Sequence, residues 1–163
     1  MRIEIITLFP EMVEAAACYG VTGRALDKGI WSLSGRNPRD FASDSYRTVD
    51  GRPYGGGPGM VMTVEPLCKA LDAAREALRT AGIESAPVVH LSAQGEPLTP
   101  RRVVAPAATP ALAPLAGRCA GADERFMWRE VALEFGRGDL LGPGGASARP
   151  RGAGAGGARC HGR

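Results

Sequence analysis

The chain has 163 residues, enough for one α/β domain with a hydrophobic core but short for two. Hydrophobic residues make up an ordinary 44%, whereas 23 glycines and 13 prolines exceed the usual combined share of about 12%, so part of the chain is not expected to pack. The net charge is +3, and 18 of the 20 basic residues are arginine, which suits phosphate contacts but also follows from a GC-rich gene.

The sequence disfavours both membrane insertion and metal binding. Residues 1–9 lack the apolar segment and cleavage site of a signal peptide, and no run reaches the roughly 18 apolar residues of a membrane span. Four scattered cysteines without a CxxC pair, together with two histidines, predict neither a disulfide framework nor a metal site. We therefore expect a cytoplasmic protein without a metal or a membrane contact.

The N-terminal segment predicts a strand, a tight turn and a helix. Residues 2–9 are β-branched and apolar, and Pro10 can begin a helix that Gly20 stops. A second, shorter helix is expected over residues 22–28 and another strand over residues 30–34.

A long polar loop, residues 37–59, precedes a clearer helix. Thr63 is expected to cap this helix, Pro66 fits its first turn and Gly82 closes it. Its apolar residues recur at helical spacing and predict one buried face, made of Leu67, Leu71, Ala74 and Leu78.

A short apolar run, residues 88–91, predicts a buried strand that ends in the turn Ser92-Ala93-Gln94-Gly95. Ligands of open α/β sheets bind at the carboxyl ends of strands. The turn is therefore a candidate binding segment.

The composition changes after Arg102. Residues 103–116 carry Pro106, Pro110 and Pro114, a spacing that opposes both helix and strand interior. The final segment, residues 142–163, is rich in Gly, Ala and Arg and has too little apolar bulk to offset the entropy of ordering. We expect one domain over residues 1–141, degraded at 103–116, and a disordered basic tail over residues 142–163.

The most distinctive motif runs from Arg47 to Met60 and contains Tyr54 followed by Gly55-Gly56-Gly57. Glycines let the backbone approach a ligand closely, while arginine and tyrosine offer phosphate contacts and base stacking. The motif lacks the Gly-Lys-Ser/Thr of a P-loop and does not fit GxGxxG. A purely structural turn is the alternative for this segment.

Several motifs together resemble one family. Residues 19–25 (YGVTGRA), 38–40 (PRD), 47–60 (RTVDGRPYGGGPGM) and 91–95 (LSAQG) are similar, in order and spacing, to the N-terminal signatures of the bacterial tRNA (guanine-N1)-methyltransferases of the SPOUT superfamily. The resemblance implies an α/β domain with a parallel sheet and a C-terminal trefoil knot, one of the exceptions to unknotted chains. It also implies a homodimer that uses S-adenosylmethionine to methylate guanine N1 beside the anticodon of tRNA.

The resemblance assigns two sets of binding residues. Those for tRNA and its guanine are Arg24, Arg47, Asp50, Arg52, Tyr54, Gly55, Gly56, Gly57 and Gly59. Those for the cofactor are Ser92, Gln94, Gly95, Gly117, Gly121, Arg137, Gly138, Asp139, Leu140, Leu141 and Gly142.

The second half of the chain departs from the family pattern. Residues 116–125 and 137–145 resemble the cofactor loops, but Cys119 and Leu140 replace family tyrosines, and Pro114 and Pro143 predict a damaged knot. The family's aspartate base and helical C-terminal domain have no counterpart after Asp139, so the catalytic residue is unknown and activity is expected to be impaired.

Asp50 is a possible substitute base on residue type alone. Two other functional alternatives stay open: a non-catalytic remnant that binds RNA or dimerises, and a non-functional, truncated or frameshifted gene product.

Overall fold

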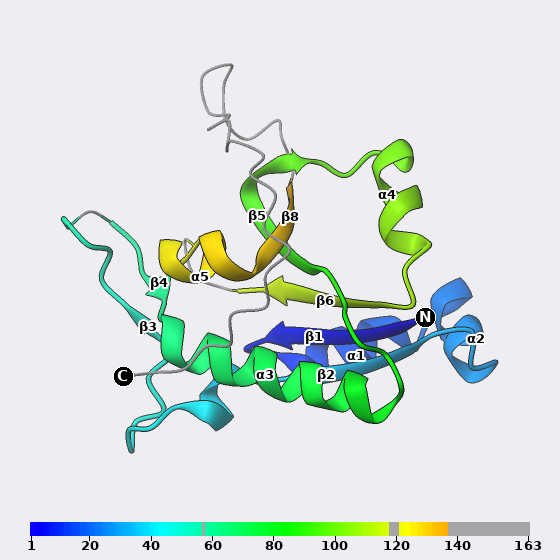
Figure 1. Cartoon of the computed structure of the whole chain (residues 1–163), viewed down its shortest axis with the longest axis horizontal. Helices are drawn as coiled ribbons and strands as arrows, with labels where there is room; N and C mark the ends of the chain where they lie inside the picture. Colours follow the sequence, from blue (N-terminus) through cyan, green and yellow to red (C-terminus); the bar gives the residue numbers. More distant parts are fainter. Residues whose placement is uncertain (57, 118–120, 137–163) are drawn as a thin grey trace.

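The computed structural model describes residues 1–56, 58–117 and 121–136, with the side chain of Gln94 left out (Figure 1). The strands are β1 (Arg2–Thr7), β2 (Ser32–Arg36), β3 (Asp50–Gly51), β4 (Val61–Met62), β5 (Val88–Pro97), β6 (Ala111–Ala116), β7 (Gly121–Ala122) and β8 (Val131–Gly136). The helices are α1 (Pro10–Ala17), α2 (Gly20–Asp27), α3 (Val64–Thr80), α4 (Pro100–Ala107) and α5 (Glu124–Glu130), with a 3-10 turn η1 (Pro38–Phe41).

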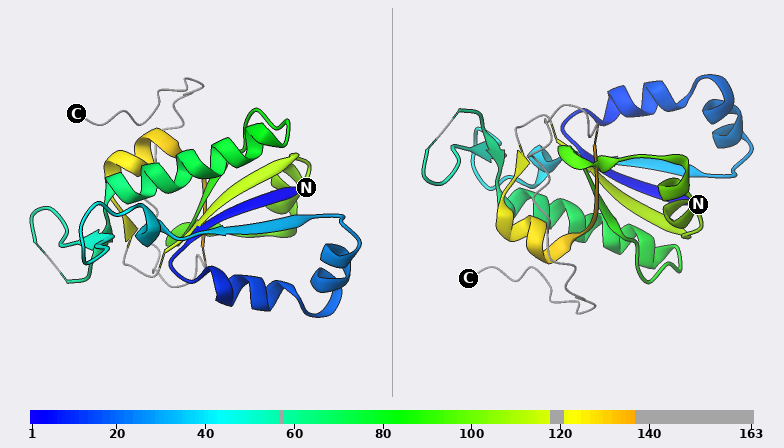
Figure 2. Two further views of the ribbon diagram at one scale, coloured as in Figure 1. Left: turned by 90° about the horizontal axis from the view of Figure 1, so that it is seen from below. Right: turned by 90° about the horizontal axis from the view of Figure 1, so that it is seen from above.

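Within these residues, five strands form a wholly parallel sheet in the order β2-β1-β6-β5-β8. Helices α3 and α5 cover one face, and α1 and α2 lie on the other (Figure 2). Parallel strands joined by helices bury both faces of a sheet. The predicted α/β fold with a parallel sheet is confirmed.

The core lies between the sheet and α3. The four residues predicted from helical spacing are buried, and Leu67 and Leu71 pack in one cluster with Ile6 of β1 and Leu115 of β6. Thr63 precedes α3 as expected, but its hydroxyl donates to the Val49 carbonyl at 3.3 Å and does not cap the helix. The prediction of a side-chain cap was wrong because the Thr63 hydroxyl points to the Val49 carbonyl, which also accepts from the Thr63 amide at 2.9 Å.

A charged residue is buried inside β1. Glu4 has no exposed surface, and its two carboxylate oxygens accept from Arg2 Nε at 2.9 Å and from Arg36 Nε at 3.0 Å. Both arginines remain about one-third exposed, with side-chain exposures of 33% and 30%. A buried carboxylate needs such pairing, because an unpaired charge in the interior is strongly destabilising.

Residues 103–116 form regular structure, contrary to the expectation from their prolines. They supply most of α4 and all of β6, and β6 lies in the middle of the sheet. Arg2 N donates to Pro110 O at 2.9 Å. Hydrogen bonds in a parallel ladder repeat every two residues, so the nitrogen of Pro114 lies opposite the carbonyl of Glu4. Pro114 therefore removes one ladder bond on the β1 side, while Ala113 N still donates toward β5 at 3.1 Å.

Other expectations shift at the boundaries. The second strand lies at residues 32–36 instead of 30–34, and the predicted turn at residues 92–95 is an irregularity within β5. Cys68 on α3 is disulfide-bonded, a bond that the prediction of no disulfide framework did not anticipate. The knot and the 142–163 tail stay predictions, since residues 118–120 and 137–163 lie outside the described residues.

Candidate functional site

A small second sheet lies at the carboxyl ends of the main strands. Strand β4 pairs antiparallel with β3 and parallel with β7, through Met62 opposite Ala122. Asp123 N donates to the Met62 carbonyl at 2.9 Å, so α5 begins where β4 ends. This arrangement brings the β3–β4 hairpin beside α5 at one end of the molecule (Figure 1).

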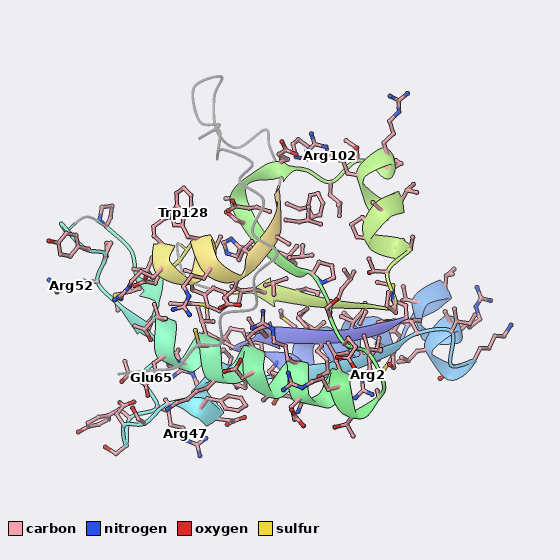
Figure 3. All side chains as sticks on the ribbon, viewed as in Figure 1. Arg2, Arg47, Arg52, Glu65, Arg102 and Trp128 are labelled. Carbon is pink, nitrogen blue, oxygen red and sulfur yellow. The ribbon has the colours of Figure 1, made fainter. Side chains whose placement is uncertain are left out.

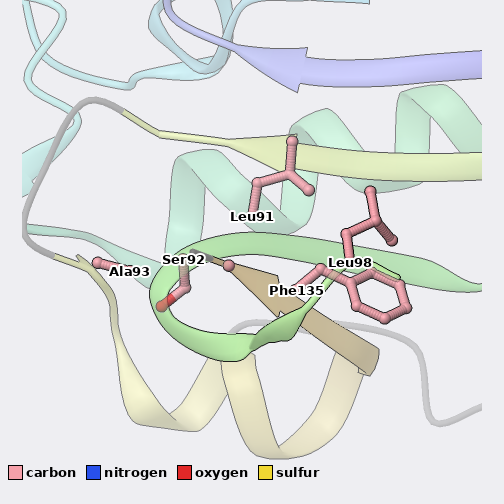
Figure 4. Close-up of a pocket in the computed structure, with 6 residues that line it drawn as sticks. Leu91, Ser92, Ala93, Leu98 and Phe135 are labelled. Carbon is pink, nitrogen blue, oxygen red and sulfur yellow. The ribbon is translucent and has the colours of Figure 1, made fainter. Parts of the chain in front are cut away.

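Two adjoining cavities lie at this edge, and both are lined by residues 91–93 of β5. The smaller, about 180 Å³, is lined by Met62, His90, Leu91, Ser92, Ala93, Gly117 and Gly121. The larger, about 360 Å³, is lined by Leu91, Ser92, Ala93, Leu98, Phe135 and Gly136 (Figure 4). The larger is a shallow depression open to solvent, whereas the smaller is more enclosed but below the roughly 300 Å³ of a typical small-molecule site.

The wall shared by the cavities is a bulge in β5. Leu91 and Glu96 both pair with Phe135 of β8, so residues 92–95 are displaced from the ladder. The displaced segment passes close to the end of β8: a Cβ on Gly95 would lie 2.4 Å from Phe135 C, and one on Gly136 would lie 1.8 Å from Ser92 O. Only glycine allows this approach, which sets the position of Ser92.

The sequence did not single out His90 and Met62 as lining residues. His90 Nδ1 lies 3.2 Å from Glu134 Oε1 on β8, and both side chains are largely buried. Sequence alternation holds a signal for His90, because it lies two residues after the buried Val88 and two before Ser92. No comparable signal marks Met62, which reaches the cavity only through the pairing of β4 with β7.

The predicted RNA loop lies next to the same edge. Gly55, Gly56 and Gly59 have φ values of 83°, 84° and 92°, a backbone region that favours glycine. Tyr54 is fully exposed, and Arg52 is exposed at the side of the molecule where Trp128 also lies (Figure 3).

The segment that leads into this loop is held by a local network. Asp44 accepts from the Thr48 amide at 2.9 Å and its hydroxyl at 2.6 Å, and these bonds lower the pKa of Asp44. Arg47, which lies between Asp44 and Thr48 in the sequence, adopts a backbone φ of 52°, an uncommon value for a residue other than glycine or asparagine. Arg47 also lies 3.5 Å from the Asp40 carboxylate, and its carbonyl accepts from Arg39 at 3.2 Å. Strained residues of this kind concentrate at functional sites.

Asp50 does not line the smaller cavity, but it pairs with Met62, which does. It pairs directly with Met62, and opposite residues of an antiparallel ladder share a face. The sulfur of Met62 lies next to Gly117, since a Cβ there would be 2.6 Å from it. The half-buried Asp50 is therefore on the face of the small sheet that looks toward the cavity.

The structure brings together only part of the predicted set. Ser92, Gly117 and Gly121 meet at one cavity, and Gly95 supports the bulge beside it. Arg24 is exposed on α2, which lies at the opposite end of the molecule from the hairpin (Figure 1). The predicted residues outside the described part are Gly57, Arg137, Gly138, Asp139, Leu140, Leu141 and Gly142.

Comparison with known proteins decides the family. The family described as tRNA (Guanine-1)-methyltransferase TrmD matches residues 1–149. The chain belongs to this TrmD family. It is 51% identical over 145 residues to a tRNA (guanine-N(1)-)-methyltransferase of Chromobacterium violaceum and 53% identical over 145 residues to that of Nitrosospira multiformis. Each alignment covers 89% of this chain and 57% of the relative.

A solved TrmD structure shares the fold. The crystal structure of the tRNA (m1G37) methyltransferase from Aquifex aeolicus aligns with a TM-score of 0.75 and 30% identity, over 86% of this chain and 61% of that one. The chain thus spans a little more than half the length of its TrmD relatives.

Two kinds of feature are absent from the described residues. None of their helices has the length and apolarity to cross a membrane. No cluster of three or more potential metal ligands occurs within residues 1–56, 58–117 and 121–136.

Proposed function

We propose that this chain is the SPOUT methyltransferase part of a TrmD enzyme and methylates guanine N1 next to the anticodon of tRNA, with S-adenosylmethionine as the methyl donor. The observation that carries the proposal is the meeting of Ser92, Gly117 and Gly121 at one cavity beside the Gly-rich hairpin. Two segments far apart in the sequence, residues 91–95 and 116–125, supply these residues, and each resembles a motif that the family uses for its cofactor.

The cavity residues fit an adenosyl group. Residues 91–93 and the two glycines offer mainly backbone N–H and C=O groups, and Met62, Leu91 and Phe135 add apolar walls. This combination suits a flat apolar base with a few polar edges. When bound, the cofactor supplies a methyl group on a positively charged sulfur.

The protein must position guanine and accept its N1 proton. Methylation of N1 would require the loss of its proton to a base within hydrogen-bond reach, and a protein that holds guanine beside the bound methyl donor would bring the two together. Asp50 is the candidate for this role in the described residues, because its register with Met62 places it on the cavity side of the hairpin. Arg52 and Tyr54 would hold the surrounding RNA.

The remaining parts of the proposal follow from the family. We propose a cytoplasmic homodimer that binds tRNA where the two subunits meet, with Arg24 among the residues that contact the tRNA. Gln94 and residues 137–142 would complete the cofactor site.

Two measurements test the proposal. Calorimetry with S-adenosylmethionine should give saturable binding to the wild-type chain and weaker binding to Gly117→Val, because the larger side chain enters the space next to Met62. Gly51→Ala is the matched control, since its Cβ would make only an ordinary 3.7 Å contact with Thr63. The second measurement is transfer of radiolabelled methyl groups to a tRNA transcript with guanine beside the anticodon, and to one with that guanine replaced.

Transfer restricted to the guanine transcript would support the full proposal. Binding of tRNA and cofactor without transfer would contradict the catalytic part and favour the non-catalytic remnant. A folded chain that binds neither would overturn the proposal entirely.

A further inference from the structure

We propose that α5 presents Trp128 as a stacking platform for an unpaired base of the bound RNA, which extends the RNA surface beyond the β3–β4 hairpin. The inference rests on the proposed function. Nothing in the family motifs assigns a role to Trp128, which follows the matching DER segment by three positions.

Trp128 is 64% exposed although it sits on a firmly anchored helix. Its neighbours Phe126 and Met127 are buried in the core, and Glu130 pairs with Arg75 of α3 at 2.7 Å. Asp123 caps the N-terminus of α5 by accepting from the Arg125 amide at 2.9 Å. The indole is therefore held in a defined place on the surface, as a recognition residue must be.

The helix lies beside the segment already proposed to contact RNA. Strand β7 leads into α5 and pairs with β4, whose other neighbour is β3. Arg52 and Trp128 consequently lie on the same side of the molecule (Figure 3). A strand of RNA held by the hairpin can continue over the outer face of α5.

The residues around Trp128 favour an anionic, aromatic partner. Arg52 is exposed at the hairpin, and the Arg125 side chain is 77% exposed while it pairs with Asp123 at 2.8 Å. Exposed arginines contact phosphates, and an exposed indole stacks on unpaired bases, as in proteins that bind single-stranded nucleic acid. Arg52 at the neighbouring hairpin is exposed and suits a phosphate-bearing partner, whereas the charge of Arg125 is offset by Asp123.

Tryptophan emission offers a direct test, because the chain has only two tryptophans. Trp31→Phe leaves Trp128 as the sole reporter. Titration of that variant with an anticodon stem-loop should quench its emission, because stacking on a base quenches indole. A fully paired RNA hairpin of the same length should bind more weakly and leave the emission unchanged.

Affinity measurements complete the test. Trp128→Ala should weaken stem-loop binding by roughly 5- to 150-fold, the usual effect of losing one stacked base, while Trp128→Phe should keep most of the affinity. Met12→Ala is the control, because Met12 is an apolar residue with a similar exposure of 66%, located on α1 across the sheet. It should leave affinity unchanged.

The inference fails if Trp128→Ala binds the stem-loop as tightly as the wild type, or if the emission of Trp128 does not respond to RNA. An emission change that depends on protein concentration without RNA would also overturn it, since a second copy would then cover the indole. If the wild type binds cofactor but no RNA, the proposed tRNA substrate fails as well. RNA binding that does not depend on Trp128 is a different result, because it would overturn this inference and leave the proposed function intact.

Discussion

The close approach of β5 and β8 predicts that Gly95→Ala will damage both stability and the cofactor cavity. The added methyl carbon would lie 2.4 Å from Phe135 C and 2.7 Å from both Gly136 N and Phe135 O. Non-bonded carbon atoms normally approach to about 3.5–4.0 Å. The two strands would have to separate by about 1 Å, and all three clashing atoms belong to backbone that cannot rotate away.

The expected cost follows from this geometry. Overpacking a core position costs about 1–3 kcal/mol, and clashes with strand backbone place this change near the upper value. For a domain of roughly 150 residues, about 3 kcal/mol corresponds to a fall in Tm of about 6–12 °C. Separation of the strands would also move Ser92, so affinity for S-adenosylmethionine should fall together with stability.

Urea denaturation followed by circular dichroism, with calorimetry of cofactor binding, measures both effects. Gly51→Ala is again the matched control, because it adds a methyl group in a strand at an ordinary 3.7 Å contact and should change stability by less than about 0.5 kcal/mol. If Gly95→Ala unfolds at the same urea concentration as the wild type, with the same m-value and cofactor affinity, then β5 and β8 do not pack this closely at the bulge.

Three further substitutions test other parts of the fold. Glu4→Gln should lower the free energy of unfolding by about 1–3 kcal/mol, because it weakens the hydrogen bonds that Arg2 and Arg36 donate to a buried carboxylate while both arginines stay partly exposed to water; an unchanged urea midpoint would show that the buried pairing contributes nothing. Pro114→Ala should raise stability by about 1 kcal/mol through a new ladder bond to the Glu4 carbonyl, and a lower Tm would refute the register of β6 against β1. Asp123→Asn should cost about 0.2–1 kcal/mol at pH 7, since hydrogen bonds from Arg125 hold the pKa of Asp123 below its ordinary value. That contribution is present above the unfolded pKa of about 3.9 and disappears as pH falls through the lower folded value, so denaturation at pH 7 and pH 3 should show the difference shrinking; a difference independent of pH would contradict the pairing.

Several elements were predictable because their signals are local. The buried face of α3 follows from the spacing of Leu67, Leu71, Ala74 and Leu78, and that face packs on the sheet. The opening strand and helix were predicted within two residues of β1 and α1. Such patterns reflect backbone geometry over a few residues, which the sequence states directly.

The prolines of residues 103–116 show where local reasoning failed. Pro106 lies in the last turn of α4 and removes the single bond that its nitrogen would donate to the Arg102 carbonyl, and Pro114 sits in β6 with its nitrogen toward a single neighbour. The buried residues Ala111, Ala113 and Leu115 pack against α3 and hold the strand in place. The packing of these side chains therefore outweighs the hydrogen bond that Pro114 cannot donate. Strand propensity alone does not predict this outcome.

For the candidate site, the sequence by itself determined which residue types are present and, through motif order, the TrmD family. It identified Ser92, Gly117 and Gly121 and the hairpin that carries Tyr54. Only the tertiary structure decided that these segments meet at one cavity, that His90 and Met62 line it, and that α2 with Arg24 lies at the other end of the molecule. The reason is that contacts between distant segments depend on strand order and register. In this chain they depend on the pairing of β4 with β7 and on the bulge in β5, which form only when the chain folds.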